Sequence, residues 1–79
     1  MIFPNPASNE FRLLFHSSRE QEYVLLITDA SGKTVSVENV TAIDGRNILE
    51  RVLEGWLPGI YNVTLFSDDR QSSVRLVVH

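Results

Sequence analysis

The sequence contains no cysteine, which excludes disulfide bonds and thiolate chemistry. Histidine is also scarce, with two among the 79 residues. No apolar run approaches the roughly 18 residues that a membrane-spanning helix needs. Seven lysines and arginines stand against ten acidic residues, which gives a net charge of −3. This balance argues against nucleic acid or an anionic membrane as a partner, because both favour a basic face.

The length limits how the chain can be organised. A chain of 79 residues forms at most one domain, and a domain of this size buries only about 60–65% of its unfolded surface. We therefore expect residues 1–79 to form a single domain of modest stability. The start lacks the basic and apolar regions of a signal peptide. Met1 stands directly before the apolar Ile2, so we expect an initiator added to a fragment excised from a larger protein.

Apolar and polar residues alternate with a period of two, which predicts β-strands. Residues 23–28 are instead nearly all apolar and rich in strand-forming types, so they are predicted to form a central strand. Val35 and Val37 fall on one face of their strand. The alternating segments are 11–16, 34–40, 61–66 and 74–79. The apolar side chains that share a phase should be the most buried, namely Phe11, Leu13, Phe15, Leu25, Ile27, Tyr61, Val63, Leu65, Val74 and Leu76.

Proline, glycine and aspartate mark the ends of these strands. Pro4 and Pro6 each lock φ and lack an N–H, so Ile2 and Phe3 can form only a short edge strand before a stiff turn. The Asn5 side chain can bond to nearby backbone in that turn. The other predicted turns are residues 29–32, with aspartate first and glycine last, residues 44–45, and a polar hairpin loop at residues 67–70.

Residues 47–53 are ambiguous, because their apolar side chains fit helical spacing as well as a strand. Gly55, Pro58 and Gly59 would end a helix quickly, and predicted strands stand on both sides. We therefore predict a strand for residues 47–53. About seven short strands separated by turn residues are typical of an antiparallel β-sandwich.

Candidate catalytic and metal-binding residues are few. His16 and His79 have no partner at the spacing of a zinc site, so we expect His16 on an exposed strand face and His79 at a frayed chain end. Ser17 could act as a nucleophile only with a base, an orienting group and an oxyanion hole in a cleft, which a small sandwich lacks. Asp68 and Asp69 supply too few oxygens for Ca²⁺. We predict no catalytic residue, no metal and no cofactor.

Two further patterns allow both a structural and a functional interpretation. Asn39 and Asn62 each begin a glycosylation acceptor sequence, which we interpret as chance because the pattern is common. Trp56, Tyr61 and Phe66 could form a platform for stacking sugars. The phase of Tyr61 favours core packing instead. We expect Trp56 to cap the open end of the sandwich, with exposure to a partner as the alternative.

Three groups of residues occur in a fixed order along the chain. Phe3-Pro4-Asn5-Pro6-Ala7 stands first, Asp29-Ala30-Ser31-Gly32 follows, and Leu57-Pro58-Gly59-Ile60-Tyr61 precedes a closing Arg75-Leu76-Val77-Val78. In order and spacing they resemble the C-terminal sorting domain of type IX secretion cargo proteins from the Bacteroidetes. That family has Pro-Asn-Pro at its start, then a strand ending in Asp-x-x-Gly, then Leu-x-x-Gly-x-Tyr, and a final basic-aliphatic strand. The resemblance covers essentially the whole chain.

The resemblance implies an all-β, immunoglobulin-like antiparallel β-sandwich that acts as an export address and not as an enzyme. Such a domain guides folded cargo through the type IX secretion machinery, by way of the periplasm, to the cell surface, the outer membrane or the extracellular space. A surface signal peptidase usually removes it, although some members keep it. An exposed strand edge could also pair with a second copy, so a homodimer through strand edges is a candidate assembly.

The resemblance also assigns residues. The last strand is the candidate element for recognition by the machinery, and we expect its end to be accessible. The sequence departs from the family pattern at Trp56, which stands where leucine is usual, and at Arg75 and His79, where lysine is common. The alternatives are an extracellular carbohydrate- or protein-binding module of immunoglobulin or fibronectin style, and a spacer domain. The motif residues are Pro4, Asn5, Pro6, Asp29, Gly32, Gly59 and Tyr61, and the recognition candidates are Arg75, Leu76, Val77, Val78 and His79.

Overall fold

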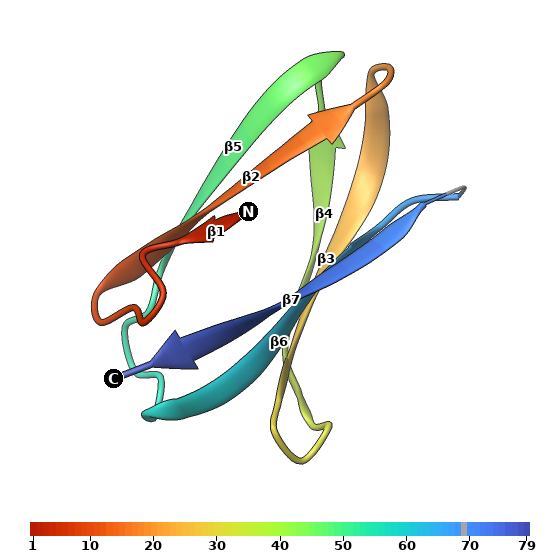
Figure 1. Ribbon diagram of the computed structural model, residues 1–79. Helices are drawn as coiled ribbons and strands as arrows, with labels where there is room; N and C mark the ends of the chain where they lie inside the picture. The colour runs from red at the N-terminus through yellow and green to blue at the C-terminus, as the bar shows by residue number, and fades with distance from the viewer. Residues whose placement is uncertain (69) are drawn as a thin grey trace.

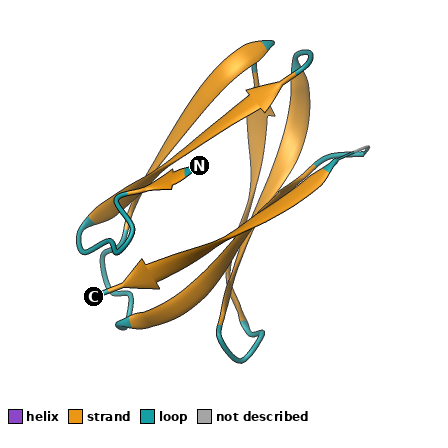
Figure 2. Ribbon diagram, in the orientation of Figure 1, coloured by secondary structure: helices purple, strands orange, loops and turns teal. Residues whose placement is uncertain are grey.

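In the computed structural model, which describes residues 1–68 and 70–79, every regular element is a β-strand (Figure 1; Figure 2). The alternating sequence explains this, because a period of two lets each strand bury one face. No helix in this part of the chain could cross a membrane. The strands are β1 (Ile2–Phe3), β2 (Glu10–Ser17), β3 (Gln21–Asp29), β4 (Thr34–Ala42), β5 (Gly45–Val52), β6 (Gly59–Phe66) and β7 (Gln71–Val78).

The strands form two antiparallel sheets, which Figure 1 shows as two layers. One sheet has the order β1-β2-β5 and the other has the order β4-β3-β6-β7. Because β3 pairs with β4 on one side and β6 on the other, the predicted central strand at residues 23–28 is confirmed. The predicted strand at residues 47–53 is confirmed as β5, whose bounds differ by one or two residues. The predicted fold class, an immunoglobulin-like antiparallel β-sandwich, is confirmed.

The side chains between the two sheets form one hydrophobic core. All the predicted core residues are buried except Phe15 and Val74, which are partly buried at its margin. The prediction missed Ala7 and Leu53, which lie outside the alternating segments but are also buried. Full burial of one aliphatic or aromatic side chain contributes about 1.5–3 kcal/mol. The further buried apolar residues that the prediction did not include are Ile2, Tyr23, Val40, Ala42 and Val78.

Val35 and Val37 of β4 share one face, as predicted, and that face is turned to solvent. Val35 and Val37 are 41% and 60% exposed. The opposite face of β4 carries Ser36 and Glu38, which are half-buried. Glu38 forms an ion pair with Arg51 of β5, in the other sheet. At this part of β4, charged side chains therefore connect the two sheets, and Val35 and Val37 do not.

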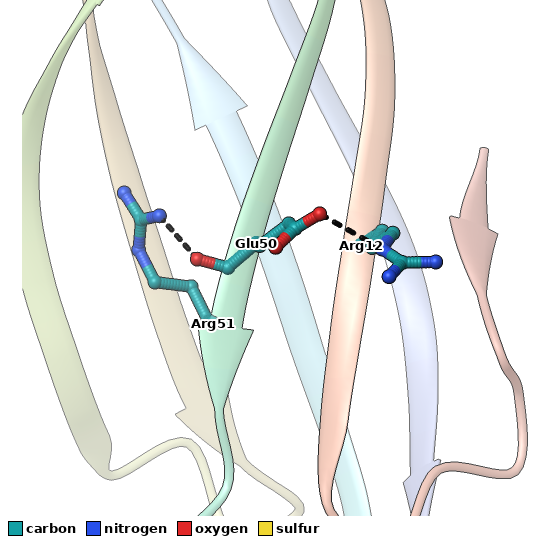
Figure 3. A network of polar contacts seen from close by, with 3 residues as sticks. All are labelled: Arg12, Glu50 and Arg51. Carbon is teal, nitrogen blue, oxygen red and sulfur yellow. Dashed lines mark hydrogen bonds and ion pairs between the residues drawn. The ribbon is translucent and has the colours of Figure 1, made fainter.

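Glu50 and Arg51 extend this contact to the outer face of β2 (Figure 3). Arg51 donates from Nη1 to the backbone carbonyl of Glu50 at 2.6 Å. Arg12, directly opposite Glu50 in the ladder between β2 and β5, donates from Nε to Glu50 Oε1 at 3.0 Å. Both side chains of this second pair are largely exposed. Solvent screening therefore limits its contribution to at most about 1 kcal/mol.

A buried serine lies where β2 passes to β3. Ser17 has no exposed surface, and its Oγ donates to the carbonyl of Arg19 at 2.6 Å. The same oxygen accepts from the Tyr23 hydroxyl at 3.1 Å and from Gln21 Nε2 at 3.2 Å. All the hydrogen-bonding capacity of the hydroxyl is thus used within the fold, which gives Ser17 a structural role.

The predicted turns at residues 29–32 and 44–45 are present. The second connects β4 to β5 and so passes from one sheet to the other. Asn47 stabilises it, because its side-chain amide bonds to both the N–H and the carbonyl of Ile43 at 3.0 Å. Between β6 and β7 the N–H of Ser67 donates to the carbonyl of Arg70 at 2.8 Å. Asp69 of the predicted hairpin loop lies outside the described residues.

Candidate functional site

The motif residues are far apart in sequence and meet at one end of the four-stranded sheet. Asp29 of β3 pairs with Tyr61 of β6, and Tyr61 pairs with Leu76 of β7. Gly59 and Val78 pair at the end of the same ladder. In Figure 1 this end lies at the bottom, where the C-terminus is beside the start of β6. The structure therefore brings together the separate segments that the resemblance singled out.

Residues 4–7 pass from one sheet to the other and place Asn5 against the outer edge of β7. Asn5 Nδ2 donates to the backbone carbonyl of Arg75 at 2.8 Å. Asn5 Oδ1 accepts from the backbone N–H of Val77 at 2.9 Å. A side-chain amide offers the same donor and acceptor as a peptide group. Asn5 thus occupies the place of a neighbouring strand along this part of β7.

Ala7 extends this cover to the end of the chain. Its N–H donates to the carbonyl of Val77 at 2.8 Å, and its carbonyl accepts from the N–H of His79 at 2.8 Å. Ala7 is fully buried and pairs with Val78 in a parallel bridge. The backbone edge of β7 from Arg75 onward is therefore occupied.

One prediction about the chain end is wrong for this reason. The backbone N–H of His79 is bonded to the carbonyl of Ala7, so this end is not frayed, although His79 itself is exposed. The sequence of the last strand alone does not indicate its contacts with residues 5–7, because Asn5 and Arg75 are seventy positions apart in the chain.

The residues proposed for recognition divide between the core and the surface. Leu76 and Val78 face the other sheet and are 0% and 4% exposed. Arg75 and His79 are exposed, and Val77 is half-buried. A partner that approaches the folded domain can therefore contact three of these side chains, Arg75, Val77 and His79. The other two anchor the strand.

The outer face of this end of the sheet combines apolar and polar side chains. Val77 lies opposite Ile60 in the ladder between β6 and β7, and Ile60 is 46% exposed. Arg75 lies opposite Asn62, which is exposed. Cross-strand neighbours on one face lie about 4.5–5.5 Å apart at their Cβ atoms. These four residues therefore form one small surface, which we call the terminal face.

The aspartate of the first turn holds the loop between β3 and β4. Asp29 Oδ1 accepts from the Ser31 hydroxyl at 2.7 Å, from the Ser31 N–H at 3.0 Å and from the Lys33 N–H at 3.0 Å. The Ser31 hydroxyl bond, followed by the Lys33 N–H bond, lowers the pKa of Asp29 below its usual value of 3.8. Gly32 has a φ of +90°, which a residue with a side chain rarely adopts. The Asp-x-x-Gly spacing is thus explained by the turn alone.

Tyr61 and Trp56 close the same end of the sandwich. Tyr61 is buried, and its hydroxyl donates to the carbonyl of Leu57 at 2.6 Å. The Trp56 ring centroid lies 4.9 Å from that of Tyr61 and 6.4 Å from that of Phe11. Trp56 therefore caps the core, as predicted, and Trp56 and Tyr61 do not form an exposed platform for sugars.

The arrangement can hold a strand end in place, and it offers few groups for chemistry. Within residues 1–68 and 70–79, no group of three or more histidine, cysteine, aspartate or glutamate residues is placed to hold a metal ion. His16 lies on an exposed strand face, as expected. Of the aspartate pair weighed as a calcium site, Asp69 is outside the described residues.

Sequence reasoning missed how the Pro-Asn-Pro segment contacts β7. It predicted that the Asn5 side chain bonds to nearby backbone, whereas both bonds go to the last strand. The only local signal was a polar side chain between two prolines, which lack donors of their own. Nothing in that signal indicates the partner.

The comparison with protein families matches residues 1–79 to the secretion system C-terminal sorting domain. No curated protein and no solved structure was found to match the chain.

Proposed function

The chain belongs to the family of secretion system C-terminal sorting domains, and from this premise we propose that its last strand presents the side chains that the secretion machinery reads. Membership makes the domain a C-terminal secretion signal for the type IX secretion system. Such a signal interacts with that machinery and serves secretion across the outer membrane, to the cell surface or the extracellular space. The family is a sorting signal and not a catalytic family.

The observation that supports this proposal is the way Asn5 and Ala7 close the outer edge of β7. A partner that added a strand at this edge would have to displace the two hydrogen bonds of Asn5 and the two of Ala7. Contact with the outward side chains displaces none of them. We therefore assign recognition to Arg75 and Val77 of the terminal face, together with His79.

Further parts of the proposal concern the whole protein. Residues 1–79 act as one sorting domain that derives from a larger protein, and the cargo precedes it. The folded cargo passes through the periplasm, and a signal peptidase at the surface removes the domain. The domain itself carries out no reaction, since the sorting role requires binding alone.

We also propose that pairing between two copies, where it occurs, uses the free edge of β4 or β5. Each of these strands pairs with one neighbour among the described residues, whereas residues 5–7 occupy the terminal half of the β7 edge. Exposed edges of this kind can add a strand from another chain. Light scattering of a variant with lysine in place of Val37 tests the β4 edge, and an unchanged dimer fraction would contradict its use.

The sorting role is tested by display of a reporter at the surface of a host that has the secretion system. A reporter fused to the domain should reach the surface, whereas the same reporter without the domain should not. Equal display of both would contradict the sorting role and favour an extracellular binding module. A folded tag appended after His79 tests whether the chain end must be free, and full display of the tagged fusion would contradict that requirement.

The terminal face needs a separate variant. Arg75→Ala removes an exposed charge from β7 and should reduce display. Arg46→Ala is the matched control, because Arg46 is exposed on the outer face of β5 in the other sheet. Equal loss of display in both variants would contradict a specific role for Arg75, and thermal melting of each variant shows whether the fold is intact.

A further inference from the structure

A groove opens on the side of the sandwich beside Met1, where β1 begins. Two hollows of about 370 and 260 Å³ adjoin there and share Phe15, Leu65 and Ser72 in their linings. Their apolar linings also include Leu13 and Val63. The groove thus exposes part of the core margin between β2 and the first half of β7, where neither β1 nor residues 5–7 reach.

The groove also has a free backbone edge along β2. Met1 donates from its amino group to the carbonyl of Leu14 at 2.9 Å, and its carbonyl accepts from the N–H of Leu14 at 2.7 Å. Alternate residues of an antiparallel strand direct their backbone groups to the same edge. His16 therefore directs its N–H and carbonyl to the side on which Met1 lies. No strand in residues 1–68 and 70–79 pairs with His16 there.

We propose that the segment joining the cargo to this domain continues β1 as a strand, pairs with His16 and fills the groove. This rests on the proposed function, in which the cargo precedes the domain. The occupant follows from continuity, because the ladder between β1 and β2 already includes Met1 and Leu14. Once Met1 is paired with Leu14, the antiparallel register of the residue directly before Met1 on β2 is fixed.

The geometry also specifies the chemistry of the segment. Ile2 faces the core, and side chains alternate along a strand. The first and third residues before Met1 therefore face the groove and should be apolar. The second residue before Met1 pairs with His16 and faces solvent.

The cargo segment is favoured over a second copy of the domain because it is covalently attached. Attachment gives a short segment an effective concentration of the order of millimolar. A second copy would have to reach a comparable concentration in solution and would also have to fit beside Met1.

Hydrogen exchange at the amide of His16 tests the proposal. The 79-residue domain is compared with a longer chain in which about ten cargo residues precede the position that Met1 occupies, a length sufficient for a strand. The exchange rate of the His16 amide should fall by about tenfold or more in the longer chain, because a paired amide is protected. An unchanged exchange rate would overturn the proposal.

Two variants of the longer chain provide the controls. Ser72→Trp fills the groove from β7 and should remove the protection of His16. Thr41→Trp places the same bulk on the exposed outer face of β4 and should leave it. Aspartate at the first and third residues before Met1 should also remove the protection without altering the domain. Retained protection in that variant and in Ser72→Trp would overturn docking in the groove.

The outcomes separate this proposal from the sorting role. Protection of His16 that rises with concentration in the 79-residue domain indicates a second copy in the groove and overturns the assignment to cargo. Normal surface display with an unprotected His16 contradicts the docked segment alone. A protected His16 with no domain-dependent display contradicts the sorting role alone.

Discussion

Asn5 accepts a hydrogen bond at 2.9 Å from the backbone N–H of Val77, which lies seventy-two positions further along the chain. The same side chain donates to the carbonyl of Arg75. One asparagine thus supplies both a donor and an acceptor to the edge of the last strand, between two prolines that can donate nothing from their backbone. This explains why an asparagine stands between the prolines of the motif.

Asn5→Ala should lower the free energy of unfolding by about 1–3 kcal/mol, because each of the two lost hydrogen bonds contributes roughly 0.5–1.5 kcal/mol. Urea denaturation measures the change, and amide exchange of Val77 localises it. Asn62→Ala removes the same side chain from an exposed position on β6 and should change stability by less than about 0.5 kcal/mol. Equal effects of the two variants would contradict the role given to Asn5.

Leu25→Ala and Leu65→Ala should each lower the free energy of unfolding by about 2–5 kcal/mol, since both remove buried methyl groups and leave a cavity. Both side chains are nearly inaccessible, at 1% and 5% exposure. Thermal melting measures the loss. Val37→Ala, on the outer face of β4, is the control and should melt close to the parent. If either core variant melted at the same temperature as Val37→Ala, the free-energy cost of the cavity at that position would be small, which would contradict the prediction.

Gly59→Val should destabilise the domain by more than the roughly 0.4–1 kcal/mol that unfolded-state entropy can account for. Gly59 has a φ of +157°, and a Cβ added there would meet no atom within 4 Å. The expected cost therefore comes from the backbone angle and not from a clash. D-Alanine at this position, introduced by chemical synthesis, prefers positive φ and should be tolerated. Equal melting of the L-valine and D-alanine forms would contradict this explanation.

Acidification should remove the stabilising effect of the Asp29 carboxylate. Its pKa is lowered in the folded state, first by the hydroxyl of Ser31 and then by the N–H of Lys33, from a usual value of 3.8. The Asp29 carboxylate therefore contributes fully to the free energy of unfolding above pH 3.8. This contribution is lost as the pH falls through the lower pKa that Asp29 has in the folded state. The measurement is the difference in urea midpoint between the parent and Asp29→Asn, at neutral pH and well below 3.8. The difference should shrink in acid, and a constant difference would contradict the assignment.

Much of the fold could be predicted, because strands and their inner faces depend on local alternation. Phe11 and Leu25 follow directly from a period of two, and the structure buries both. β4 shows the limit of that rule. Val35 and Val37 lie outward, while Glu38 turns inward to meet Arg51 of the other sheet. A local pattern cannot indicate that an edge strand has a charged partner across the sandwich.

The candidate site could be predicted less completely. The turn of Asp29 is local, so the spacing to Gly32 was sufficient to predict it. The burial of Ala7 and the cover over β7 depend on contacts between the first and last segments of the chain. Their geometry is set only when both sheets have formed, and no short pattern contains that information.

The bonds between residues 5–7 and the last strand bear on the order in which the signal can arise during synthesis. Within the domain, residues 5–7 leave the ribosome well before their partners Arg75, Val77 and His79. A nascent chain that stops ahead of Arg75 leaves Asn5 unmatched, and also leaves the first four residues of β6 without their partners in β7. The sorting domain is therefore assembled only in a chain whose translation has run past β7, so the fold itself distinguishes a complete domain from one that is truncated within its last strand.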